Sequence, residues 1–261
     1  MLAFAPACLI NAIGGQNGFL SAALFLGGIV WLDRRPVAAG VLFGLLTFKP
    51  HLGVVLPFAL LALGAWRVIA SATVTTIVLV AGSVALFGLE PWRQYVEVTS
   101  AYQVLLLERF HGFYTSMMVS GVASARAFGV PYSAAVLAQV MLALAVLAAA
   151  CWAVRRTSDA RARALVLASA TPLVTPYAFN YDLTALAAAL VWAACRPMPR
   201  SMGRDTILFL GWITPILAMH LNVRGLGLAP LALLAVFVLS VREAAVQAVP
   251  VARPQPRTEM A

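Results

Sequence analysis

Long apolar runs separated by short charged connectors make up most of this chain. The runs are continuous and rich in Ala, Leu and Val, without the alternation expected of transmembrane β-strands. They cover approximately residues 2–14, 18–32, 37–48, 51–65, 68–87, 132–154, 164–174, 183–195, 206–221 and 226–241. A membrane span needs about 20 apolar residues, so several runs are too short to cross a bilayer. The pattern predicts an all-α, polytopic transmembrane helical protein with about 8–10 membrane helices, several of them short or re-entrant.

Composition agrees with a membrane protein, because 62% of the residues are apolar and only 10% are charged. A soluble domain carries about 25% charged residues. The net charge of +9 comes from short Lys/Arg clusters between apolar runs. Basic residues interleaved with aromatic ones, as nucleic-acid surfaces have them, are not seen. We therefore expect membrane lipids and no nucleic acid as partners. The isolated cysteines lack metal-ligand spacing, so neither a metal site nor a cofactor is predicted.

The charged connectors predict an orientation in the cell (inner or plasma) membrane, which the chain would cross several times. If the charged connectors are cytoplasmic, all but five of the 18 Lys and Arg residues lie inside. This orientation agrees with the enrichment of Lys and Arg in cytoplasmic loops. We expect one transmembrane domain over residues 1–246 and a disordered, Pro-rich cytoplasmic tail over 247–261. Residues 88–131 would form an external amphipathic segment, with one helix near 105–109 and a second over 115–128.

Lys49-Pro50-His51 interrupts an otherwise uncharged stretch of the chain. Pro50 removes a backbone donor and breaks the helix, and it also disfavours helical geometry at Lys49. A cation at membrane depth costs about 2.5–3.5 kcal/mol on insertion scales, which water or an anion would offset. The orientation makes residues 37–65 a hairpin with this tripeptide at its tip. We predict that Lys49 and His51 bind a phosphate; the alternative is a snorkelling lysine beside an interfacial histidine.

A second short hairpin, residues 164–195, starts and ends on the same side as the first. Non-helical backbone at membrane depth is tolerated where it lines a wet cavity or is buried in protein, so the two tips suggest one shared outward cavity. Polar side chains at this tip would line the sugar or acceptor part of the cavity. Alternatively, the carboxylate caps the next helix and the tyrosines form an interface belt. The residues concerned are Tyr177, Asn180, Tyr181 and Asp182.

Two other outward-facing places carry candidate binding residues. The turn at residues 14–18 presents Gln16 and Asn17, whose amides could bind sugar hydroxyls or cap the following helix. Arg109 and His111 lie on the external segment and are possible loop contacts, since an arginine there could pair with phosphate. A solvated loop position is the alternative for both.

Several of these motifs, taken in order, carry a resemblance to a known family. They run from a Gly-Gln turn through Ala-Gly-x-x-x-Gly and Lys-Pro-His to a late Pro-Tyr motif. In this sequence they are Gly15-Gln16-Asn17, Arg34 to Gly44, Lys49-Pro50-His51, Phe87 to Trp92, Thr175-Pro176-Tyr177 and Asn180-Tyr181-Asp182. Over most of residues 10–240 the chain resembles glycosyltransferase family 87, the polyprenol-phosphate-dependent mannosyltransferases and their relatives among the multi-spanning C-superfamily glycosyltransferases.

The resemblance implies an outward cavity among membrane helices and a polyprenyl phosphate sugar donor. It further implies transfer of a hexose, with mannose expected, to a lipid or glycan acceptor at the outer face, with inversion. In the family an Asp in the first external loop is the catalytic base, and this chain shows no such loop. We therefore expect an N-terminally truncated form whose catalytic base is absent. The alternatives are a lipid or solute transporter, which an inverted structural repeat would favour, and a non-catalytic remnant.

Overall fold

A computed structural model of the chain describes residues 2–110, 112–196 and 201–247. Within these ranges the backbone is helical or in short turns, and one isolated bridge joins Met118 to Phe179. The predicted all-α membrane fold is confirmed. In the part that the structure describes, three helices are long and apolar enough to span a membrane. They are α6 (Trp66–Phe87), α11 (Tyr132–Val154) and α15 (Ala229–Gln247). The predicted tail after residue 247 lies outside the described residues.

The rest of the bundle consists of shorter helices, as the short apolar runs predict, and of the 21-residue helix α14. Several begin with Pro near the first helical position, where its missing N–H costs no intrahelical bond. The bounds are α1 (Pro6–Ile13), α2 (Gly18–Trp31), α3 (Pro36–Leu45), α5 (Leu56–Leu63), α12 (Ala160–Val174), α13 (Thr184–Ala194) and α14 (Met202–Asn222).

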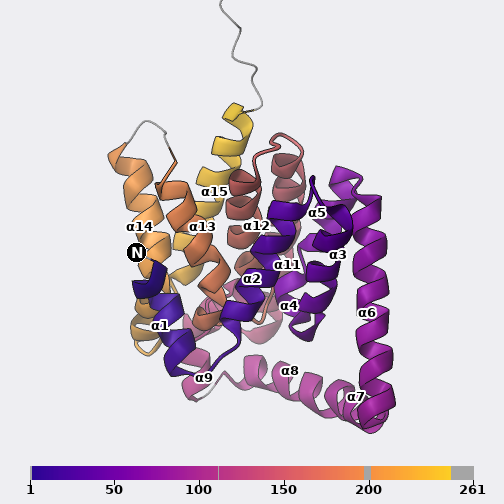
Figure 1. Cartoon of the computed structure of the whole chain (residues 1–261). Coiled ribbons are helices and arrows are strands. Elements are labelled where there is room, and N and C mark those ends of the chain that lie inside the picture. The colour runs from indigo at the N-terminus through magenta and orange to yellow at the C-terminus, as the bar shows by residue number, and fades with distance from the viewer. Residues whose placement is uncertain (1, 111, 197–200, 248–261) are drawn as a thin grey trace, which may run out of the picture.

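Helix α12 forms the centre of the bundle. Asp159 caps its N-terminus by accepting the Arg161 N–H at 2.9 Å, and every residue from 162 to 174 is buried. Helices α2, α11, α13 and α15 pack around it (Figure 1). A helix that is apolar on all sides needs such complete coverage. The packing of these helices around α12 consequently fixes the position of the turn that follows it.

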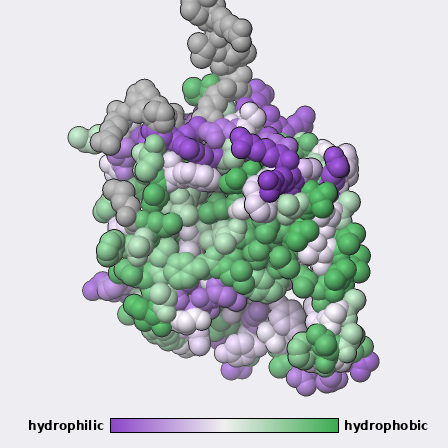
Figure 2. Space-filling view, viewed as in Figure 1, coloured by the Kyte–Doolittle hydropathy of each residue, from purple (hydrophilic) through white to green (hydrophobic). Residues whose placement is uncertain are grey.

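The bundle has two chemically different ends (Figures 1 and 2). The connectors α2–α3, α5–α6 and α11–α12 gather at the end that we call the charged end, where α13 ends and α14 begins. Hydrophilic residues form a band there, above a broad apolar middle. The tips of the hairpins α3–α5 and α12–α13 lie at the opposite end, which we call the site end.

Ion pairs formed by largely buried arginines join the helices at the charged end. Arg163 contacts Asp33 at 2.7 Å, and Arg204 Nε contacts Glu243 Oε1 at 2.7 Å. Arg196 pairs with Asp159 and lies 3.9 Å from Glu243 Oε2. These contacts connect α12, α13, α14 and α15 through groups that are mostly withdrawn from water. Buried charges require such partners, because an unpaired one is strongly destabilising.

Helices α3 and α6 approach each other through two glycines one turn apart, Gly40 and Gly44. A Cβ at Gly40 would lie 2.5 Å from Val68 O, and one at Gly44 would lie 2.5 Å from Thr75 Cβ. Small residues at this spacing let membrane helices pack closely. The Ser71 hydroxyl adds a hydrogen bond of 2.8 Å to Val37 O across the same contact.

Replacing Gly44 by Ala is therefore expected to destabilise the protein by about 1–3 kcal/mol, the usual range for overpacking. The melting temperature of the detergent-solubilised chain measures this effect. Gly82→Ala is the matched control, because a Cβ at this helical position of α6 meets nothing within 4 Å. An unchanged melting temperature for Gly44→Ala would show that the glycine contact does not hold α6 in place.

The segment between α6 and α11 forms an arm below the bundle (Figure 1). It contains α7 (Glu90–Gln94), the π-helical turn η3 (Tyr95–Thr99), α8 (Ser100–Arg109), α9 (Phe113–Ser116) and α10 (Gly121–Ala127). The helix predicted over 115–128 is thus wrong as a single element. Residues 117–119 leave helical geometry because their backbone pairs with residues 178–180, far along the chain.

Candidate functional site

The first hairpin breaks at Lys49, between the 3-10 turn η2 (Leu46–Phe48) and the short helix α4 (Pro50–Gly53). Lys49 has the extended φ of −128° and ψ of 72°. These angles lie outside the helical region, which Pro50 disfavours for the residue before it. The break turns the Lys49 side chain toward the second hairpin, and it places His51 in the first turn of α4.

Lys49, His51 and Asp182 form a cluster between the two hairpin tips. Lys49 Nζ lies 2.9 Å from Asp182 Oδ1, and His51 Nε2 lies 3.6 Å from Oδ2. The Lys49 ammonium also lies over the Tyr181 ring, 5.3 Å from its centroid. An internal carboxylate therefore offsets the cost of the buried cation in this structure. That carboxylate comes from the 3-10 turn η4 (Asn180–Leu183), which opens α13.

The exposed part of this cluster is its cationic side. The side chains of Lys49 and His51 are 14% and 27% exposed, whereas that of Asp182 is 2% exposed. An ammonium has three donors, and Asp182 is its one hydrogen-bond partner among the described residues. The distance of 3.6 Å leaves His51 Nε2 without a normal hydrogen bond. A ligand that reaches the cluster from outside would meet the Lys49 ammonium and the exposed part of the His51 ring rather than the carboxylate or the buried His51 Nε2.

Backbone pairing holds the second tip in place. The Val119 N–H donates to Ala178 O at 2.9 Å, and the Asn180 N–H donates to Met117 O at 2.8 Å. Asn222 at the end of α14 donates to Met118 O at 2.7 Å. Asp182 itself accepts the Phe179 N–H at 3.2 Å, so a local backbone bond helps to orient the carboxylate. Capping and pairing with Lys49 are thus both observed for Asp182.

Gln139 is a structural residue of this region that our sequence reasoning missed. It lies in α11, accepts the Val122 N–H at 2.9 Å and donates to Leu173 O at 2.8 Å. It therefore satisfies carbonyls at the end of α12, where Pro172 and the following turn interrupt the helix. A single amide within a long apolar helix is the signal that could have identified it. A polar side chain inside the membrane is energetically costly, so it normally has a structural or functional partner.

The other predicted residues lie at differing distances from the cluster. Tyr177 packs edge-on against Phe179, which stacks on Tyr181. Asn180 is fully buried and donates to Pro215 O at 3.1 Å, so its amide points toward α14. Gln16 and Asn17 are exposed. Their turn packs against η4, since a Cβ on the adjacent Gly18 would lie 2.9 Å from Tyr181 O.

Arg109 and His111 were predicted as possible loop contacts. Arg109 ends α8 and is exposed, whereas His111 lies outside the described residues. Their suggested role in phosphate binding stays a prediction. Among the residues that the structure describes, no group of three or more His, Cys, Asp or Glu side chains could hold a metal ion.

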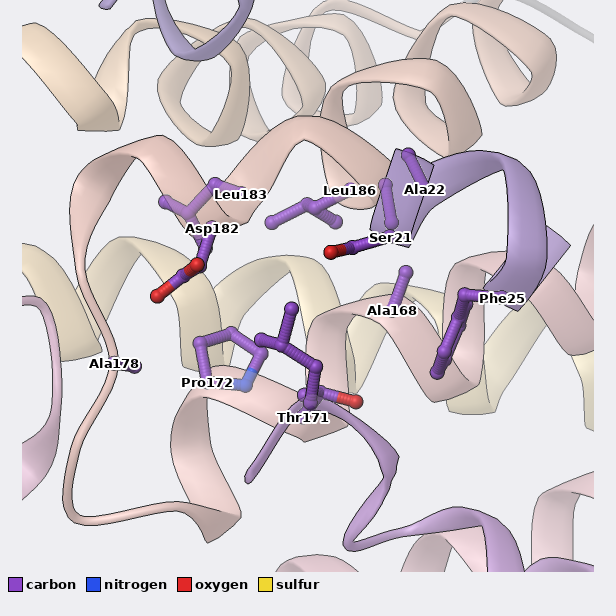
Figure 3. A pocket seen from close by; sticks show the side chains of 12 residues that line it. Ser21, Ala22, Phe25, Ala168, Thr171, Pro172, Ala178, Asp182, Leu183 and Leu186 are labelled. Atoms are coloured by element: carbon purple, nitrogen blue, oxygen red, sulfur yellow. The ribbon is translucent and has the colours of Figure 1, made fainter. Parts of the chain in front are cut away.

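A small cavity lies beside Asp182, between α2, α12 and α13 (Figure 3). Its volume of about 20 Å³ has room for one water-sized molecule. The hydroxyls of Ser21 and Thr171 lie on its wall, but they donate to Asn17 O and Leu167 O of their own helices. A ligand as large as a sugar must therefore meet the cluster from the exposed side of Lys49 and His51.

Comparison with known proteins identifies one match. The family model Glycosyltransferase family 87 matches residues 1–176, two thirds of the chain, including α1 to α12 and the Lys49 break. Neither a curated protein nor a solved structure matches the chain.

Proposed function

Because the chain belongs to glycosyltransferase family 87, we propose that it takes part in sugar transfer from a polyprenyl phosphate donor at the outer face of the cell membrane. The sugar is a hexose, with mannose as the first candidate, and the acceptor is a lipid or a glycan. The charged end faces the cytoplasm, in keeping with the preference of Lys and Arg for that side. The site end then faces outward, and the chain crosses the membrane several times.

The observation that carries this proposal is the cationic, partly exposed side of the Lys49–His51–Asp182 cluster. The phosphodiester anion of a lipid-phosphate sugar is matched by an ammonium and an imidazole held side by side. Asp182 keeps both groups in place from the buried side, which reduces the loss of side-chain freedom on binding. The broad apolar middle of the surface suits a ligand that arrives from the bilayer.

In the proposed reaction, an acceptor hydroxyl oxygen attacks the anomeric carbon of the sugar. The new carbon–oxygen bond forms on the face opposite the phosphate, the bond to the phosphate oxygen breaks, and the configuration inverts. The lipid phosphate leaves with the bonding electrons, and Lys49 and His51 stabilise its growing negative charge. A base must take the acceptor proton. Asp182 is a poor candidate, because it is buried and engaged by Lys49 and His51.

Donor binding to Lys49→Met tests the phosphate assignment. Removing a charged hydrogen bond of about 1.5–3 kcal/mol should weaken binding of a polyprenyl phosphate sugar by ~10- to 100-fold. Lys49→Arg keeps the charge and should retain most of the affinity. Arg93→Met removes an exposed cation of α7 at the same end and should change nothing. Unchanged donor affinity in a folded Lys49→Met protein would refute the phosphate site.

A further inference from the structure

An apolar groove runs along α2 and α13 and reaches the charged end of the bundle. Its volume is about 950 Å³, within the range of ligand pockets. Helix α2 contributes the face from Phe19 to Val30, and α13 contributes the face from Thr184 to Trp192. Helix α1 and the 3-10 turn η1 (Leu2–Phe4) form the remaining wall, in the half nearer the site end (Figure 1).

The groove has the length of one membrane leaflet. Between their end residues the two helix faces extend about 12–17 Å, at a rise of about 1.5 Å per residue. Half of the hydrocarbon core of a bilayer is about 15 Å thick. An acyl chain that enters from the membrane surface at the charged end would therefore fill the groove.

The walls of this groove offer hydrocarbon rather than hydrogen bonds. Ala and Leu are the commonest residues on them. The Thr184 hydroxyl also lies there, but it donates to Tyr181 O at 2.8 Å and is satisfied close to its own position in the chain. A sugar or an extended peptide would lose hydrogen bonds to water in this groove, whereas an acyl chain has none to lose.

A cation lies at the mouth of the groove at the charged end. The Arg161 guanidinium lies over the ring of Trp192, 5.6 Å from its centroid, and Trp192 itself lines the groove. Arg161 is exposed and forms no ion pair with a carboxylate among the described residues. The nearby Asp159 pairs instead with Arg196. The mouth therefore combines a guanidinium that can bind a phosphate with an aromatic ring of the kind found at the headgroup level.

We propose that this groove binds an acyl chain of an anionic phospholipid from the leaflet at the charged end, with the lipid phosphate against Arg161. The charge at the mouth selects a lipid over a partner helix. With the charged end in the cytoplasm, as proposed above, a transmembrane helix would bring mainly Lys and Arg to this level and so repel Arg161. The groove lies apart from the Lys49 cluster, and its binding of lipid does not depend on sugar transfer.

Headgroup preference in binding tests the site. Native mass spectrometry of the detergent-solubilised full chain gives the affinities for phosphatidylglycerol and phosphatidylcholine that carry the same oleoyl chains. One arginine near anionic headgroups contributes about a fivefold preference, so the unaltered protein should favour phosphatidylglycerol by at least that factor. Arg161→Gln should reduce the preference to about twofold or less.

Arg156→Gln is the matched control for the charge. Arg156 is also exposed at the charged end and lies 4.8 Å from the centroid of the Trp152 ring, but neither residue lines the groove. This variant should keep the full preference. Equal losses in the two arginine variants, or no preference in the unaltered protein, would refute the proposed site.

Ala23→Trp tests the groove itself, because Ala23 is an exposed residue on its α2 wall. The added side chain should weaken binding of phosphatidylglycerol by about 10-fold, since it takes the place of several methylene groups of the lipid. Ala145→Trp, on an exposed face of α11 outside the groove, should change nothing. Unchanged lipid binding in a folded Ala23→Trp protein would show that the groove is not the site. A dimer that Ala23→Trp dissociates would assign the groove to a second copy of the chain instead.

Discussion

Asp182→Ala is expected to lower the melting temperature by on the order of 10 °C and sugar transfer by at least ~10-fold. Removing one partner of a buried ion pair costs about 3–5 kcal/mol, because the other charge stays buried without compensation. For a chain of this size, each kcal/mol corresponds to about 2–4 °C. The stranded charge here would be the Lys49 ammonium, whose side chain is 14% exposed. Donor binding should weaken too, since both phosphate ligands lose the group that positions them.

Control variants separate the effect of Asp182→Ala from the effect of losing any carboxylate. Glu97→Gln removes a carboxylate from the exposed arm at the same end, and it should leave stability and donor binding within experimental error. Asp182→Asn keeps the shape and a carbonyl oxygen for the Phe179 N–H, so it isolates the charge. If Asp182→Asn folds with native stability and binds donor normally, the carboxylate does not position Lys49 and His51.

The second large effect is expected at the charged end, from Glu243→Ala. The Glu243 side chain is 8% exposed and contacts Arg204 at 2.7 Å, with Arg196 at 3.9 Å. Its removal deprives two largely buried arginines of a partner, so we expect a loss of about 3–5 kcal/mol in unfolding free energy. The measurement is again the melting temperature. Donor affinity in the folded fraction should stay unchanged, because the contact lies at the end opposite the cluster.

Asp205→Ala provides the control at the same end. Its side chain is 51% exposed and lies 3.8 Å from Arg204, so its removal should cost less than about 1 kcal/mol. A double-mutant cycle between Glu243→Ala and Arg204→Ala measures the pair directly, since residues in contact depart from additivity. A coupling energy near zero would mean that the Glu243 contact contributes no stability.

The helical membrane fold and the existence of two tips could be predicted because they follow from local chemistry. The local backbone is determined by the length of the apolar runs, by the proline at the break and by the charged connectors. Each of these features affects only the residues close to it in the chain. The same local argument placed Lys49 and Asp182 on tips that should share a space. The structure brings these two side chains into contact, with the Asp182 carboxylate as the hydrogen-bond partner of Lys49.

The remaining features depend on contacts between distant parts of the chain. The break of the predicted 115–128 helix arises from backbone pairing of Val119 with Ala178 and of Asn180 with Met117, which no local pattern reveals. The amide of Asn180 looked suited to a cavity, yet packing directs it to Pro215 O. Whether a polar side chain faces a cavity or a neighbouring helix is decided by packing, so residue type alone could not settle it.

The Lys49–Asp182 pair has a consequence for biogenesis, because its partners are 133 residues apart. The chain is synthesised from its N-terminus at about 5–20 residues per second, so the hairpin that carries the cation enters the membrane before its carboxylate exists. For several seconds the ammonium must be accommodated by water or by lipid phosphates at the interface. Completion of the second hairpin then draws the first tip into its final position. The ion pair that orders the finished site can thus form only after α1 to α12 have been synthesised.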